Sequence, residues 1–100
     1  MVSKILLACA GGFSTSMLVQ RMKTAAEQKG LVIEILAVAE DNIPDHPDSD
    51  VVLLGPQIGH RLDDLKEELT VPVYVIESFD YGTMNGEKVL DFVLAELNGK

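Results

Sequence analysis

The sequence is poor in cysteine and in aromatic residues, and it contains no long hydrophobic run. Its 100 residues include one cysteine and no tryptophan, and aromatic residues make up 5%. A lone thiol leaves no partner for an intramolecular disulfide and is consistent with a reducing compartment. No stretch approaches the roughly 18 apolar residues that cross a bilayer, and the N-terminal residues do not resemble a cleaved signal. We therefore expect a cytoplasmic protein.

Basic residues are also scarce. Eight lysine and arginine residues stand against sixteen acidic residues, which gives a net charge of −8. The basic residues do not cluster, so nucleic acid is not an expected partner. Hydrophobic residues make up 47% and charged residues 24%, as in an ordinary globular protein. This length and composition predict one domain over residues 1–100 with a single packed core.

Apolar runs and helical periodicity alternate along the chain. Short apolar runs predict strands at 4–8, 31–38, 50–55 and 71–77, of which the first and third should be buried. Apolar residues three and four apart predict helices at 15–29, 56–69 and 87–97. The first helix should bury Met17, Leu18, Met22, Ala25 and Ala26. We expect a loop with one short helical turn at 39–50 and another loop at 78–86.

Alternating strands and helices are typical of right-handed βαβ crossovers. The expected fold is therefore α/β, a four-stranded parallel sheet with helices on both faces. Ligands bind outside the carboxyl ends of the strands in such sheets. Three segments should meet there, namely 9–16, 55–57 and 78–82.

Cys9 follows the first strand and opens the segment "CAGGFSTS", which runs into a helix. Backbone N–H groups and the positive end of the helix dipole at this place favour an anion, either a thiolate or a phosphoryl group. Gly11 and Gly12 allow close approach of a ligand, and the Ser-Thr-Ser hydroxyls can donate hydrogen bonds. The same residues also suit a buried cysteine at a strand end, followed by a turn and a helix cap.

Other phosphate-binding and redox motifs fit less well. The sequence has no G-x-x-x-x-G-K-[ST], and "GGF" does not complete G-x-G-x-x-G. A C-x5-R phosphatase loop would need an arginine where Thr15 stands, so the bidentate guanidinium clamp is missing. A thiol redox pair needs a second cysteine. His46 and His60 have no ligand spacing to Cys9, so we expect no metal or cofactor.

Three segments together resemble a known family: "CAGGFSTS", "VVLLGPQI" and "DYGTMNG". The chain resembles the enzyme IIB component of the lactose/cellobiose (lactose/chitobiose) branch of the bacterial phosphoenolpyruvate-dependent sugar phosphotransferase system. The resemblance extends over essentially the whole chain. It implies a flavodoxin-like fold, similar to low-molecular-weight tyrosine phosphatases, and a phosphotransferase component that forms a phosphocysteine.

The resemblance also implies site residues and partners. Cys9 would receive a phosphoryl group from a phosphohistidine of enzyme IIA and pass it to a sugar held by membrane enzyme IIC, at the inner face of the membrane. The sugar would be β-linked, such as cellobiose, chitobiose or lactose. Ala10 replaces the small polar residue of many relatives. The implied phosphate-binding residues are Ala10, Gly11, Gly12, Phe13, Ser14, Thr15 and Ser16.

Two further residues follow the third and fourth strands. Gln57 and Tyr81 would border the pocket, or would be a solvent-facing amide and a packed aromatic. Phe13 would either dock a partner or pack inward. Lys4 is expected to be solvated, and His60 and Arg61 are expected on an exposed helix. We expect a monomer. A small cysteine-dependent phosphatase and a non-catalytic binding module on the same fold remain the alternatives.

Overall fold

A computed structural model describes residues 3–9 and 16–98. Its four strands form one parallel sheet in the order β2-β1-β3-β4, which is the start of the flavodoxin-like order. The strands are β1 (Lys4–Cys9), β2 (Glu34–Ala39), β3 (Val51–Leu54) and β4 (Val73–Val75). The predicted α/β architecture is therefore confirmed.

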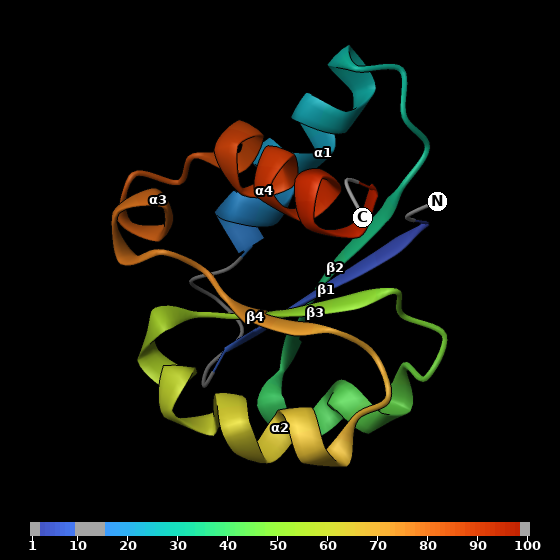
Figure 1. Ribbon diagram of the computed structural model, residues 1–100. Helices are drawn as coiled ribbons and strands as arrows, with labels where there is room; N and C mark the ends of the chain where they lie inside the picture. Colours follow the sequence, from blue (N-terminus) through green and yellow to red (C-terminus); the bar gives the residue numbers. More distant parts are fainter. Residues whose placement is uncertain (1–2, 10–15, 99–100) are drawn as a thin grey trace.

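Helices cover both faces of the sheet (Figure 1). One face carries α1 (Ser16–Gln28) and α4 (Gly86–Asn98). The other carries two 3₁₀ helices, η1 (Glu40–Asp45) and η2 (Pro56–Arg61), together with α2 (Leu62–Glu68). A short helix, α3 (Ser78–Gly82), follows β4. Among the described helices, none is both long enough and apolar enough to cross a membrane.

The central strand β1 divides the core into two clusters. Ile5 and Leu7 pack with α1 and α4, whereas Leu6 and Ala8 pack with residues of η1, η2 and α2. This alternation follows from the two-residue period of a strand. All four side chains are fully buried, which explains the unbroken apolar run in the sequence.

The buried stripe of α1 differs by one residue from the predicted stripe. Val19 is buried, whereas Met17 is 54% exposed, so the prediction for Met17 was wrong. Each residue of a helix turns by about 100°, which places Val19 beside Met22 and Met17 on the opposite flank. The predicted end of α1 is confirmed, because Gly30 follows it with a φ of 71°.

Several boundaries also differ from the predicted ones. Residues 78–86 were expected to form a loop, but they contain α3, whose five residues are too few to show a helical period. The helix expected at 56–69 begins as 3₁₀ helix η2, and Ile58 marks a kink there. The strand expected at 71–77 is reduced to Val73–Val75. The short helical turn expected within 39–50 is confirmed as η1.

Lys4 lies at the amino end of β1 and is not solvated as expected. Its side chain is 11% exposed, and its Nζ lies 2.9 Å from Asp48 Oδ1 and 3.2 Å from His46 Nδ1. The nearby Asp50 carboxylate accepts hydrogen bonds from the backbone N–H groups of Ser3 and Lys4. These contacts join β1 to the segment before β3 at the amino edge of the sheet.

Candidate functional site

The carboxyl ends of the strands form the edge where a ligand is expected. Cys9 ends β1, Gly55 follows β3, and α3 begins shortly after β4. The first turn of α1 starts at Ser16, so the positive end of its dipole lies on this side of the sheet (Figure 1).

Gly55 lies directly against Cys9. Its backbone N–H donates to the carbonyl of Ala8, with an N–O distance of 2.9 Å. A methyl group built on Gly55 would lie 3.4 Å from Cys9 Cβ and 3.0 Å from Gln57 Oε1. The amide of Gln57 therefore lies on the same side of Gly55 as the Cys9 side chain, and a methyl group on Gly55 would crowd Gln57 and contact Cys9.

Cys9 itself is almost fully buried, with 2% of its surface exposed. A buried thiol cannot meet a large donor without becoming more exposed.

Only part of the predicted phosphate-binding segment can be placed. Ser16 is the first residue of α1 and is exposed. The other six predicted residues lie outside those that the structure describes, and they are Ala10, Gly11, Gly12, Phe13, Ser14 and Thr15. Their roles remain predictions from the sequence.

The two predicted border residues have different surroundings. Gln57 is exposed in η2, close to Cys9. Tyr81 lies in α3 with 7% of its surface exposed, and it belongs to the core cluster that contains Leu18 of α1. Tyr81 therefore connects α3 to the core beneath α1. The proposed roles of both residues at the pocket remain predictions.

Arg61 has partners that the sequence did not reveal. It ends η2, where its Nε donates to Glu40 Oε2 and its guanidinium also pairs with Asp64 and Glu68. These contacts, led by the hydrogen bond to Glu40, raise its pKa. Because Glu40 immediately follows β2, the pair fixes η2, which carries Gln57, to the carboxyl end of β2. The 21-residue separation of the pair explains why spacing gave no signal.

The described residues contain no group of three His, Cys, Asp or Glu side chains that could hold a metal ion. His60 is exposed on η2. Within the described residues, the candidate site brings together one thiol, the close backbone of Gly55 and one amide.

Comparison with known sequences identifies a family model that matches this chain. The model for the PTS system, lactose/cellobiose specific IIB subunit, matches residues 4–92. The chain is 43% identical over 95 residues to the galactose-specific EIIB component of Lactococcus lactis subsp. cremoris, covering 86% of this chain and 88% of the relative. It is 39% identical over 98 residues to the oligo-beta-mannoside-specific EIIB component of Bacillus subtilis, covering 94% and 95%.

Solved structures give a consistent picture. The cellobiose-specific phosphotransferase IIB component of Borrelia burgdorferi matches with a TM-score of 0.81 and 43% identity, covering 98% of this chain and 94% of that one. The lactose-specific IIB domain of Streptococcus pneumoniae matches with a TM-score of 0.83, covering 97% and 99%. Its identity is 20%, so this second match supports the fold alone.

Proposed function

Because the chain belongs to the lactose/cellobiose-specific IIB subunits of the sugar phosphotransferase system, we propose that Cys9 carries a phosphoryl group. The donor is a phosphohistidine of enzyme IIA, and the acceptor is a sugar bound by the membrane component IIC. The observation that carries the proposal is the position of Cys9, the single thiol of the chain, at the carboxyl end of the central strand β1.

The reaction consists of two in-line displacements at phosphorus. In the first, the Cys9 thiolate attacks, an S–P bond forms, and the P–N bond to the imidazole breaks. The imidazole leaves with its electron pair and takes up a proton. In the second, a sugar hydroxyl attacks and loses its proton, an O–P bond forms, and the S–P bond breaks to restore the thiolate.

The phosphoryl oxygens need hydrogen-bond donors during both steps. We propose that the backbone N–H groups of residues 10–16 and the hydroxyls of Ser14, Thr15 and Ser16 supply them. The start of α1 at Ser16 supports this assignment, because a helix N-terminus favours a phosphoryl group. Charges more than about 8 Å away are largely screened at physiological salt, so the net charge of −8 does not oppose this site.

Gln57 is proposed to contact the phosphoryl group or its donor. Its side-chain oxygen lies beside the Gly55 backbone that backs Cys9, and its amide can supply a further hydrogen-bond donor. Thr15, at the position where a cysteine-dependent phosphatase has its arginine, supports a carrier that holds the group without hydrolysing it.

We propose a β-linked disaccharide as the sugar, selected by IIC. The relatives carry the descriptions galactose-specific, cellobiose-specific and oligo-beta-mannoside-specific. Such different sugars on similar chains support a site that handles the phosphoryl group and leaves the sugar to the membrane partner.

Replacing the thiol tests the proposal. Cys9→Ser should abolish sugar-dependent phosphoryl transfer in an assay with phosphoenolpyruvate, the general phosphotransfer proteins, IIA and IIC-containing vesicles. Circular dichroism should show an unchanged fold, because Ser is nearly isosteric. Gln57→Ala should lower the transfer rate, whereas Gln28→Ala, at the far end of α1, should not. Sustained transfer by the Cys9→Ser variant would refute the proposal.

A further inference from the structure

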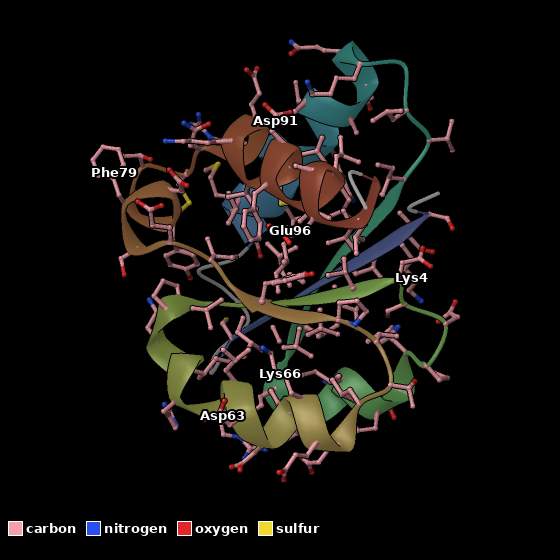
Figure 2. All side chains as sticks on the ribbon, in the orientation of Figure 1. Lys4, Asp63, Lys66, Phe79, Asp91 and Glu96 are labelled. Atoms are coloured by element: carbon pink, nitrogen blue, oxygen red, sulfur yellow. The ribbon has the colours of Figure 1, made fainter. Side chains whose placement is uncertain are left out.

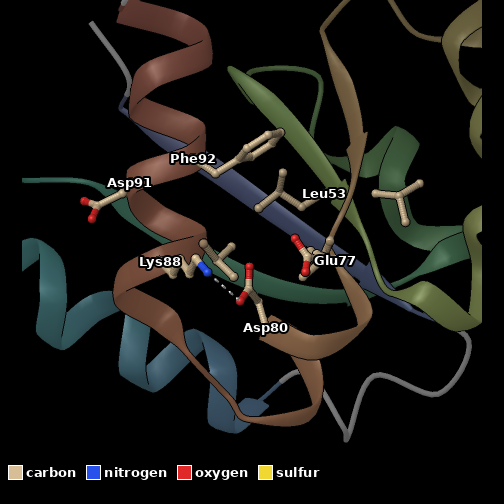
Figure 3. A pocket seen from close by; sticks show the side chains of 9 residues that line it. Leu53, Glu77, Asp80, Lys88, Asp91 and Phe92 are labelled. Atoms are coloured by element: carbon tan, nitrogen blue, oxygen red, sulfur yellow. Dashed lines mark ion pairs between the residues drawn. The ribbon is translucent and has the colours of Figure 1, made fainter.

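A cavity lies between the edge strand β4 and helix α4 (Figure 3). Its volume is about 510 Å³, within the range of small-molecule sites. Its walls combine an apolar set, Leu53, Val75, Ile76, Val89 and Phe92, with four charged residues, Glu77, Asp80, Lys88 and Asp91. The cavity is therefore large enough, and apolar enough, to hold a small organic molecule.

Asp80 is the unusual member of this lining. Only 7% of its surface is exposed, and its Oδ1 is buried with no hydrogen-bond partner. Lys88 Nζ lies 3.8 Å from that oxygen, which is too far for a hydrogen bond. A buried carboxylate with an unused acceptor lowers the stability of the fold, so a hydrogen-bond donor placed beside this oxygen would be favourable.

Among the described residues, Lys88 is the nearest cation to this oxygen, but it is held weakly. Its side chain is 63% exposed, so it can move into solvent and keep its hydration. Figure 3 shows Lys88 reaching from α4 toward Asp80, with Glu77 nearby. The remaining carboxylate of the lining, Asp91, already pairs with Lys29 at 3.0 Å. Two carboxylates, Glu77 and Asp80, are thus matched by one weakly held ammonium group.

We propose that this cavity binds a small organic cation, an ammonium group on an apolar body. The ammonium group would displace Lys88 and donate hydrogen bonds to Asp80, and the apolar body would pack against Val89 and Phe92. A neutral ligand would leave the carboxylates unbalanced, and an anionic ligand would be repelled by them. The lining of the cavity does not include Cys9, Gly55 or Gln57, and the proposal does not depend on phosphoryl transfer.

The requirement for a positive charge can be tested by adding small-molecule probes to the full chain and monitoring its amide signals by two-dimensional NMR. The probes are 2-phenylethylammonium and its neutral analogue 2-phenylethanol. The cation should shift the amide signals of residues 76–80 and 88–92. The alcohol should bind at least tenfold more weakly, because charge-assisted hydrogen bonds are about twice as strong as neutral ones. Equal binding of the two probes, or shifts elsewhere, would overturn the proposal.

Two variants should move the affinity for 2-phenylethylammonium in opposite directions. Asp80→Asn should weaken it at least tenfold, because the carboxylate is lost. Lys88→Gln should strengthen it several-fold, because the competing ammonium group is gone. Asp63→Asn, on α2 at the other face of the sheet (Figure 2), should leave it unchanged.

A merely structural role for the Asp80–Lys88 pair would weaken binding in both variants, and that result would also overturn the proposal. Melting temperatures of all variants would show that each is folded. The Cys9→Ser variant should bind the probe with wild-type affinity, so the outcome of this test is independent of the outcome at Cys9.

Discussion

The contact between α1 and α4 allows a quantitative prediction at Gly86. A methyl group built on Gly86 would lie 2.5 Å from Arg21 C and from Met22 N. Both are backbone atoms, so the two helices would have to move apart. Overpacking lowers the free energy of unfolding by about 1–3 kcal/mol. Because the neighbouring atoms are rigid backbone, we expect the overpacking cost of Gly86→Ala near the upper end of this range. The higher helix propensity of alanine offsets at most about 1 kcal/mol of this cost.

We therefore expect Gly86→Ala to lower the free energy of unfolding by about 2 kcal/mol. In a domain of this length, that loss lowers the melting temperature by about 8–16 °C. Far-UV circular dichroism during heating, and during urea titration, measures both quantities. Gly82→Ala is the matched control, because a methyl group there meets no atom within 4 Å. If Gly86→Ala unfolds within about 0.5 kcal/mol of the wild type, as surface substitutions do, the reasoning is refuted.

Three further predictions concern residues at the amino and carboxyl ends of the strands. Gly55→Ala should displace the Gln57 amide and slow phosphoryl transfer, while the melting temperature changes little; an unchanged transfer rate would contradict this. The backbone N–H of Ser3 holds the pKa of Asp50 below its usual 3.8. The Asp50 carboxylate therefore contributes its full stabilisation of the fold above pH 3.8, and this contribution is lost as the pH falls through the lower pKa of the folded state. Asp50→Asn should therefore reduce the loss of melting temperature in acid, and an unchanged acid profile would count against the contact. Arg61→Lys should lower the melting temperature, because lysine cannot keep three carboxylates paired in this geometry. Added salt should reduce the difference in melting temperature between the variant and the wild type. Equal melting temperatures would show that the ion pairs of Arg61 contribute nothing to stability.

The sequence was sufficient to predict the sheet and its main helices, because burial imposes clear periods on long elements. Ile5 to Ala8 form an unbroken apolar run since both faces of β1 are covered. The five residues of α3 are too few to show a period. Met17, Leu18 and Val19 are all apolar and consecutive in the sequence, so spacing alone did not decide which of Met17 and Val19 is buried.

The candidate site was predictable in part. Cys9 ends one buried strand and Gln57 comes shortly after another, so the parallel topology brings them to one edge. Arg61 was missed because its partner Glu40 is 21 residues away in the sequence. Outside this site, Asp80 was missed because the shape of a cavity leaves no pattern in the sequence. A sequence pattern reports on neighbours along the chain, whereas the surroundings of these two residues come mainly from tertiary contacts.

The central claim is that the phosphoryl group resides on Cys9. The most direct measurement is mass spectrometry of peptides from the protein after incubation with phosphoenolpyruvate, the general phosphotransfer proteins and IIA. We predict one phosphoryl group on the peptide that contains Cys9, its loss when IIC-containing vesicles and sugar are added, and its absence in the Cys9→Ser variant. Phosphate on another residue, or steady release of inorganic phosphate without sugar, would contradict the account.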